Sequence, residues 1–504
     1  MSNIKIGWAS RNISTDKPVL VPGMAYLRTS NGTHDPITAT VMVVEDGDSA
    51  IFITVDMVSV GSATLDTVRE KVARKDPSVP VGNIIINATH THAGPTRTPH
   101  FADMETVDGK WKAVHELEVA SSDEYIEFMT DAISDAVCEA WQGRKEGGIA
   151  YGYGYAVVAF SRRVCYFEDT SKLKKADITD TFYSMNGTAI MYGKTDRPDF
   201  SHYEAGADHF INIVYTFDKD GKLTGAVINV PCPSQNSGHE WRLSADYWNE
   251  VRENIRRKYG DIYILAQCAA AGDLSPKILH YIQANARRLR LKFGETQEIE
   301  EYNMRRDSAE RIAAAFDEVL SWAKKDIRTS MPIQHHSERM LLPRLRISEE
   351  MYEYCRQALE LVDQKTFVKT DDKIEDFKYN TRLVAERNRL LKAIQRYKEQ
   401  DEKPELPAEI HVIGMGDIAF ATTNHELYMD FQHRIQARSP YEQTLIVQLC
   451  GQPADCANNA GYLCTERALE GRGYSAIPFS CNISPEGGQI YVNRVVEILK
   501  KMHE

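Results

Sequence analysis

Five strongly apolar runs in this sequence each stop at a group of polar, reactive side chains. The runs cover residues 83–89, 225–231, 262–268, 417–423 and 444–450, and the clearest reads NIIINAT before THTHAGP. In open α/β sheets, ligand sites form beyond the carboxyl ends of the strands. We therefore expect the segments that follow these five strands to converge on one cleft. This pattern is the main reason to predict an enzyme.

Strands alternate with helices along most of the chain. VMVVE (41–45) and AIFITVD (50–56) are separated by Asp-Gly-Asp, which is typical of a hairpin, and INIVYTF (211–217) and GAVINVP (225–231) predict a second one. Helices are expected at 64–75, 122–142, 245–259 and 488–502. The alternation predicts the α/β class, with mixed, partly antiparallel sheets flanked by helices.

Residues 278–403 differ from the rest of the chain. They are rich in Arg, Lys, Glu and Gln and are mostly helical by pattern. We interpret them as a solvated helical insertion or layer within a single catalytic domain, 1–504. A homo-oligomer formed through this layer is a further hypothesis.

The composition disfavours two classes of partner, nucleic acids and anionic membranes. A net charge of −12 and a pI near 5.7 disfavour binding to nucleic acid or to an anionic membrane, because both need clustered basic charge. No apolar run is long enough to predict a spanning helix, and the first residues do not resemble a signal peptide. Nine scattered cysteines, an odd number, favour a reduced, cytoplasmic protein.

His90 and His92 directly follow the strand at 83–89. In an extended segment, residues i and i+2 point to the same side, so both imidazoles can face one pocket. One could then bind a metal while the other hydrogen-bonds a substrate. The alternative is that both are ordinary polar side chains at a strand end.

Three further residues have both a chemical and a structural interpretation. Ser275, in GDLSP, is either an exposed hydroxyl at the reacting centre or a helix cap. Cys232, between two prolines, is a zinc ligand, a nucleophile or a small buried residue. Glu426 stands at the start of what looks like a helix, where the helix-end amides favour a carboxylate.

Taken together, these segments resemble the neutral ceramidase family. THTHAGP is similar to the family's THTHSGP signature, and GDLSP to its GD-hydrophobic-SP signature. Arg162, in AFSRRV, stands where the family has an arginine, and Glu426 stands where it has Gly-Glu-Phe. Tyr462 and Tyr474 are twelve residues apart, which matches the family's spacing of a zinc tyrosine and a substrate-side tyrosine.

The resemblance implies a zinc site and a reacting centre. His90, Glu426 and Tyr462 would be Zn²⁺ ligands, with Cys232 in place of the family's second zinc histidine and His239 in reserve. The residues implied to line the reacting centre are His92, Arg162, Ser275 and Tyr474. In the alternative interpretation, the metal is lost or changed and Cys232 is the nucleophile.

Two departures from the family concern the substrate. The chain ends soon after the catalytic region, so the family's C-terminal immunoglobulin-like domain is expected to be absent. His34 and Asp35 give an early segment more polar character than ceramidases have there, which favours a polyol, a sugar or another polar molecule over ceramide. The alternative for His34 and Asp35 is a simple turn.

The sequence therefore predicts a zinc-dependent hydrolase that cleaves an amide, ester or lactone bond in a polar, possibly carbohydrate-derived small molecule. Two alternatives stay open. One is hydrolysis or glycoside cleavage with Cys232 as the nucleophile. The other is a non-catalytic protein that binds a polar ligand.

Overall fold

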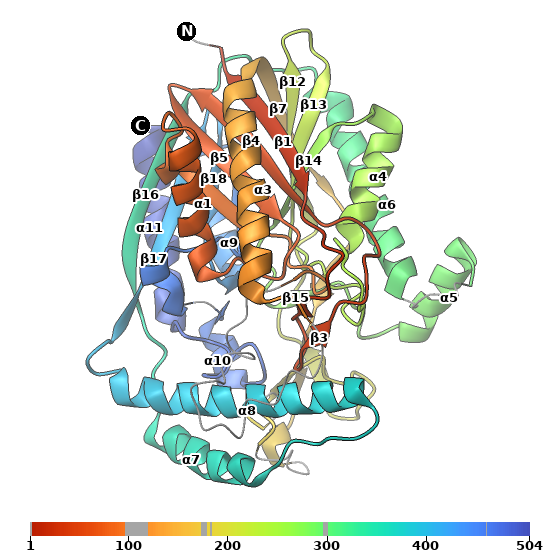
Figure 1. The fold of residues 1–504 in the computed structure, drawn as a ribbon, viewed down its shortest axis with the longest axis vertical. Helices are drawn as coiled ribbons and strands as arrows, with labels where there is room; N and C mark the ends of the chain where they lie inside the picture. Colours follow the sequence, from red (N-terminus) through yellow and green to blue (C-terminus); the bar gives the residue numbers. More distant parts are fainter. Residues whose placement is uncertain (1–2, 96–118, 173–178, 182–183, 296–300, 460) are drawn as a thin grey trace.

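A computed structural model describes residues 3–95, 119–172, 179–181, 184–295, 301–459 and 461–504 (Figure 1). The main strands are β1 (Lys5–Asn12), β4 (Thr38–Asp46), β5 (Asp48–Val55), β6 (Ile84–Ala88), β7 (Lys145–Tyr155), β12 (Phe210–Asp218), β13 (Leu223–Val230), β14 (Tyr263–Cys268), β16 (Ile333–Pro343), β17 (Glu405–Met415), β18 (Ile418–Thr422) and β20 (Gln443–Val447). The helices are α1 (Ser62–Lys75), α3 (Ser122–Gly143), α4 (Tyr247–Tyr259), α5 (Ile282–Phe293), α6 (Glu301–Ala323), α7 (Glu349–Gln364), α8 (Lys373–Glu399), α9 (Met429–Gln436), α10 (Glu466–Gly471) and α11 (Pro485–His503).

Shorter strands connect these elements. They are β2 (Leu20–Val21), β3 (Arg28–Thr29), β8 (Phe160–Ser161), β9 (Arg163–Tyr166), β10 (Ala189–Met191), β11 (Phe200–Tyr203), β15 (Leu274–Ser275), β19 (Glu426–Leu427) and β21 (Tyr462–Leu463).

The largest sheet has eight strands in the order β14-β13-β12-β7-β1-β4-β5-β6. The two predicted hairpins, β4–β5 and β12–β13, are antiparallel, whereas β6 pairs in parallel with β5 and β14 in parallel with β13. A second sheet has the order β16-β17-β18-β20, and its last two strands are parallel. The predicted mixed α/β class is confirmed.

The two sheets stack face to face between helices. Side chains alternate across a strand, so β4 sends Val41 and Val43 to the core beneath α1 and α3, and Met42 and Val44 to the opposite core. That second core lies between the sheets, where Phe52 contacts Phe420 at 4.8 Å between ring centres. Helices α9 and α11 cover the outer face of the smaller sheet.

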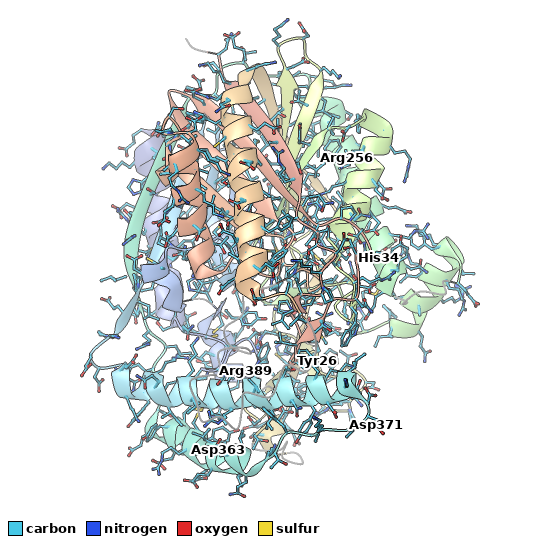
Figure 2. The ribbon with its side chains drawn as sticks, in the orientation of Figure 1. Tyr26, His34, Arg256, Asp363, Asp371 and Arg389 are labelled. Atoms are coloured by element: carbon cyan, nitrogen blue, oxygen red, sulfur yellow. The ribbon has the colours of Figure 1, made fainter. Side chains whose placement is uncertain are left out.

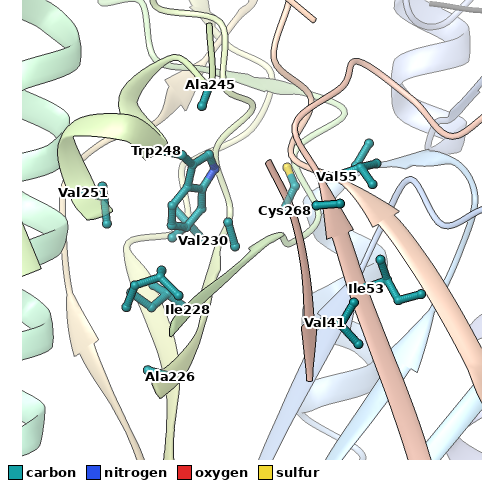
Figure 3. Close-up of a cluster of buried hydrophobic side chains, with 14 of the residues drawn as sticks. Val41, Ile53, Val55, Ala226, Ile228, Val230, Ala245, Trp248, Val251 and Cys268 are labelled. Carbon is teal, nitrogen blue, oxygen red and sulfur yellow. The ribbon is translucent and has the colours of Figure 1, made fainter. Parts of the chain in front are cut away.

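The core under α4 shows why these elements hold together (Figure 3). Ile228 and Val230 of β13 pack with Trp248 of α4, and all three are fully buried. Burying one large apolar side chain contributes roughly 1.5–3 kcal/mol. This apolar contact fixes α4 and β13, and with them the loop after β13.

The charged range 278–403 does not form one helical layer. It contains α5 to α8, but strand β16 divides it, and this strand pairs along its whole length with β17. Helix α6 packs on α4 and β7, while α7 and α8 pack on each other across the end of the sheets (Figure 1). Among the described helices, none is both long and apolar enough to cross a bilayer.

Candidate functional site

His90 and His92 lie just beyond the end of β6. His90 adopts a left-handed backbone conformation (φ 66°), which is uncommon for a residue with a side chain. Its Nδ1 atom lies 2.7 Å from the carbonyl oxygen of Val58, and its ring is 5.1 Å from the ring of His92. The chain therefore turns sharply at His90, and both imidazoles lie at the mouth of the sheet.

Glu426 and Tyr462 come from distant parts of the chain and lie side by side. They are partners in the two-residue parallel strands β19 and β21. The expectation that Glu426 starts a helix is wrong, because α9 begins three residues later, at Met429. Backbone pairing, rather than a helix terminus, places the Glu426 carboxylate beside the Tyr462 hydroxyl.

Arg162 connects these groups. Its guanidinium is buried, and one nitrogen, Nη2, lies 3.2 Å from the Tyr462 hydroxyl and 3.5 Å from the Glu426 carboxylate. The same nitrogen donates to the carbonyl of Gly272 at 2.7 Å. Although burial opposes it, the nearby Tyr462, Tyr192 and Glu426 groups raise the pKa of Arg162, so the cation persists.

The contact between His90 and Glu426 fits a bound cation. The Val58 carbonyl can only accept a hydrogen bond, so Nδ1 of His90 carries the proton. In the neutral ring, Nε2 is then an acceptor, yet it faces a Glu426 carboxylate oxygen at 3.4 Å. Two acceptors face each other stably only with a proton or a metal ion between them. A carbonyl that orients the distal nitrogen of a histidine is also typical around protein-bound metals.

The donor set for such a cation is small. In the described part of the chain, no group of three or more His, Cys, Asp or Glu side chains is arranged to hold a metal. His90 and Glu426 face each other across 3.4 Å, and the Tyr462 hydroxyl beside Glu426 is the third candidate donor. Nitrogen and oxygen donors of this kind suit zinc.

These groups open into a cavity of about 630 Å³. Its polar lining is His90, His92, Arg162, Tyr192, Gln235, His239, Lys277, Arg382, Arg389, Glu426, Tyr462 and Tyr474. Met24, Val58, Met191 and Leu279 supply apolar surface. The fold therefore brings His90, His92, Arg162, Glu426, Tyr462 and Tyr474 together at one cavity, as the resemblance implies.

His92 and Tyr474 flank the central group. Burial lowers the pKa of His92 well below its usual value, so its imidazole is neutral near pH 7. Arg28 donates to the backbone carbonyl of His92, and Gly23 lies so close that an added Cβ would be 2.6 Å from the His92 ring. The ring of Tyr474 meets that of Tyr462 edge to face at 5.8 Å. Both residues can hydrogen-bond a ligand in the cavity.

Ser275 lies behind the cavity wall. It is fully buried, and its hydroxyl accepts from the backbone N–H of Lys277 and from the Tyr192 hydroxyl, each at 3.2–3.3 Å. Tyr192 in turn accepts from Arg162 at 3.3 Å. Ser275 thus supports Arg162 through Tyr192, and it does not line the cavity.

Cys232 requires a correction, because it does not join the proposed ligands. Its side chain is fully buried in the core, and its thiol donates to the carbonyl of Val158 at 3.3 Å. Burial raises the pKa of the Cys232 thiol well above its usual value, whereas a nucleophile or zinc ligand needs the thiolate. The structure therefore favours the small buried residue over both the ligand and the nucleophile.

His34 and Asp35 also require a correction, since neither lines the cavity. Asp35 is buried, and its carboxylate pairs with Arg305 at 2.7 Å. The ring of His34 packs on Tyr302 at 5.4 Å, and Figure 2 labels His34 well away from helix α8. They are parts of a structural turn. His239 does line the cavity, with an exposed side chain.

The glycine of GDLSP, Gly272, is required by a close approach of two backbone segments. A Cβ at this position would lie 2.4 Å from the backbone carbonyl oxygen of Glu426. The neighbouring Asp273 accepts from the N–H of Met429 at 3.0 Å, at the start of α9. The motif therefore holds the Glu426 segment by close backbone approach.

Several cavity residues had no recognisable signal in the sequence. Tyr192 has a left-handed backbone conformation (φ 58°) outside any motif. Arg382 and Arg389 belong to α8, within the range interpreted as a solvated layer. Their seven-residue spacing is two helical turns, which places them on one face, but only the tertiary contact shows what that face meets.

Two solved ceramidase structures share the fold of this chain. The structure matches a crystal structure of neutral ceramidase from Pseudomonas aeruginosa with a TM-score of 0.65 and 16% identity, covering 99% of this chain and 75% of that one. A ceramidase structure described as complexed with C2 matches with a TM-score of 0.63 and 15% identity, covering 100% and 76%. The chain thus has the neutral ceramidase fold.

The match found by sequence covers less of the chain than the match found by structure. The curated neutral ceramidase of P. aeruginosa is 24% identical over 262 residues, which are 49% of this chain and 33% of that protein. The match therefore spans about a third of the length of the relative. No family model matches the sequence.

Proposed function

We propose that this protein is a metal-dependent hydrolase that cleaves an amide bond, or a related ester or lactone, in a polar small molecule. The approach of the His90 Nε2 atom to the Glu426 carboxylate, 3.4 Å apart and beside the Tyr462 hydroxyl, is the observation that supports a metal most directly. The likeness to proteins named ceramidase supports an amide as the scissile bond. The polar lining of the cavity supports a polar substrate, including a carbohydrate-derived one.

His90, Glu426 and Tyr462 would hold the metal, which we propose is zinc. When bound, zinc lowers the pKa of a coordinated water and polarises a carbonyl. Arg162 holds Glu426 and Tyr462 in place and supplies positive charge beside the position of a developing oxyanion. Neutral His92 and the Tyr474 hydroxyl are placed to exchange a proton with the substrate.

The zinc assignment is tested by elemental analysis of three metal-replete proteins. Wild type is expected to hold about one zinc per chain, and Glu426→Gln much less, because it loses a charged ligand. Cys232→Ala is the matched control and should keep its zinc, since its thiol faces the core. Zinc-free wild type, or loss of zinc only in Cys232→Ala, would contradict the proposal.

Hydrolysis is tested separately with a panel of polar amides, esters and lactones. Turnover that is abolished by a chelator, restored by zinc and lost in Glu426→Gln is the expected result. Tight ligand binding without turnover of any compound would favour a non-catalytic binding protein instead. We also propose a cytoplasmic location and a homo-oligomer. Light scattering tests the oligomer, and a monomer would contradict it.

A further inference from the structure

A second cavity, called the side cavity below, opens beside the proposed catalytic one. It has a volume of about 610 Å³ and shares Tyr192 and Leu279 with the first cavity. One wall is formed by residues 192–196, which follow β10, and the other by residues 279–284, at the start of α5. A ligand whose reacting bond lies at the proposed metal site can therefore extend past the Tyr192 ring into the side cavity.

The walls of the side cavity are held together by specific contacts. The Thr195 hydroxyl donates to the carbonyl of Leu279 at 2.7 Å, which ties one wall to the other. The Lys194 carbonyl accepts from the Tyr166 hydroxyl at 3.0 Å. Gly193 lies so close to the same hydroxyl that an added Cβ would be 2.3 Å from it. The two walls are therefore kept at a fixed separation.

Two aromatic residues that line the side cavity have an uncommon backbone conformation. Tyr192 and Tyr281 are left-handed, with φ of 58° and 55°. This conformation is costly for a residue with a side chain, and it is concentrated at functional sites, where surrounding contacts impose it. The Tyr192 hydroxyl is held by Arg162 and Ser275. The Tyr281 ring packs on that of His280 at 5.1 Å, yet 76% of the residue is exposed, so its ring has surface free for a ligand.

The remaining lining of the side cavity is mixed in polarity. Ile282 is apolar and 64% exposed, whereas Lys194, Asp196 and Gln283 bring both hydrogen-bond donors and acceptors. A hydrocarbon chain would shield these polar groups from water without hydrogen-bonding them, which is unfavourable. A pyranose ring fits better. Its C–H faces stack on the negative face of an aromatic ring, and its hydroxyls donate and accept at the edges.

We propose that the substrate carries a sugar ring, which binds in the side cavity against Tyr281 and next to the scissile bond. Tyr192 lies at the boundary of the two cavities, and its hydroxyl accepts from Arg162 at 3.3 Å, so the sugar subsite is joined to the proposed reacting centre. An amide attached to the sugar would then lie against His90 and Glu426. This inference rests on the proposed hydrolase function and adds the class of substrate.

The test compares three probes that share a hexanoyl amide. N-hexanoyl-glucosamine carries a sugar ring, N-hexanoyl-cyclohexylamine carries a ring of the same size without hydroxyls, and N-hexanoyl-ethanolamine carries a hydroxyl without a ring. Their dissociation constants are measured by calorimetry on chelator-treated protein, so that turnover does not interfere. We expect the sugar amide to bind at least about tenfold more tightly than either of the others, because it alone uses both stacking and hydrogen bonds.

Variants assign the preference to the side cavity. Tyr281→Ala removes the stacking ring and should reduce the advantage of the sugar amide to less than about threefold, whereas Tyr281→Phe keeps the ring and should retain the advantage. Leu291→Ala is the matched control, because Leu291 lies on α5, is 67% exposed and lines neither of the two cavities. Thermal unfolding checks that each variant is folded.

Three results would overturn the inference. The first is that folded wild type binds the sugar amide no more tightly than one of the other two amides. The second is that Tyr281→Ala changes the advantage no more than Leu291→Ala does. The third is that Tyr281→Phe loses as much of it as Tyr281→Ala. If the sugar preference holds but zinc-loaded protein hydrolyses none of the three amides, the sugar subsite stands and amide hydrolysis of this class fails.

Discussion

At the scale of single residues, the geometry of the proposed site depends on close backbone approaches as much as on reactive side chains. Glycine at 272 lets the GDLSP loop lie against the backbone of Glu426, and glycine at 23 leaves room for the His92 ring. His90 and Tyr192 keep left-handed backbone conformations that most residues avoid. Small changes at such positions should therefore disturb the site before they disturb the fold.

Gly272→Ala should displace Glu426 and reduce zinc binding. Its Cβ would lie 2.4 Å from the Glu426 carbonyl oxygen, so one backbone must move, and we expect a loss of about 1–3 kcal/mol in the free energy of unfolding. Urea denaturation and zinc content measure the two effects. Gly82→Ala, where nothing lies within 4 Å of the added Cβ, is the control. Equal unfolding free energy and equal zinc content in the two variants would show that the close approach at Gly272 does not position Glu426.

At the scale of elements, buried ion pairs join helix α6 to helix α4 and to the segment before β4. Arg305 of α6 contacts Asp35 at 2.7 Å and Glu250 of α4 at 2.8 Å, and all three are buried. From the sequence we expect Asp35 to line a polar substrate pocket. In the structure its carboxylate pairs with Arg305 instead. On the exposed side, Asp307 of α6 holds α5 through Arg288 at 2.7 Å.

Arg305→Met should be strongly destabilising. The change leaves two buried carboxylates without their cation, and breaking a buried pair in this way costs about 3–5 kcal/mol. Urea denaturation at pH 7 gives the loss. Arg306→Met, at the next position, removes a partly exposed guanidinium over the Phe293 ring and should cost about 1 kcal/mol or less. Similar losses of unfolding free energy in both variants would contradict a stabilising role of the buried ion pairs.

Asp307→Asn should change the pH dependence of stability. Although burial opposes it, hydrogen bonds from Arg288, Lys292 and Arg311 lower the pKa of Asp307 well below the usual 3.8. Because the pKa falls on folding, the carboxylate stabilises the protein above pH 4, and that stabilisation is lost as the pH falls further. The difference in unfolding free energy between wild type and the variant should be constant from pH 7 to pH 5 and shrink at pH 3.5. A difference that does not change with pH would refute the assignment.

At the scale of the whole molecule, the proposed metal would tie distant segments together. His90 follows β6 of the large sheet, Glu426 follows β18 of the small sheet, and Tyr462 lies a further 36 positions along the chain in β21, the partner of β19. A ligand that binds only the folded state stabilises it by mass action, by about 2.7 kcal/mol at a hundredfold excess over Kd. For a chain of 504 residues, this corresponds to a rise in Tm of roughly 2–3 °C.

Removal of the metal with a chelator should therefore lower the Tm of wild type by about 2–3 °C, and added zinc should restore it. Calorimetry measures both steps. In Glu426→Gln the chelator should have little effect, because the site has lost its charged ligand. An equal response in the two proteins would place any bound zinc elsewhere.

Local pattern was sufficient for much of the architecture. The hairpins at β4–β5 and β12–β13, the buried strands β6 and β14, and helices α1 and α3 follow from side-chain periodicity and turn residues, which act over a few positions. The pattern in 278–403 was misleading, because β16 is an edge strand that is polar from Gln334 to Arg339, so apolar and polar residues do not alternate along it.

Local sequence features were enough to predict the α/β class, many of the long strands and helices, and the polar segments after the strands that contain His90, His92 and Glu426. Arg162, Tyr462 and Tyr474 were expected at the site only because of the resemblance to the ceramidase family. Tertiary structure alone decided that Cys232 points into the core, that Asp35 pairs with Arg305, and that Arg389 of α8 lines the cavity. The physical reason is that the direction and partner of a side chain depend on segments far away in the chain. One residue type, such as a cysteine after a strand, is compatible with a ligand, a nucleophile or a core position until those segments are placed.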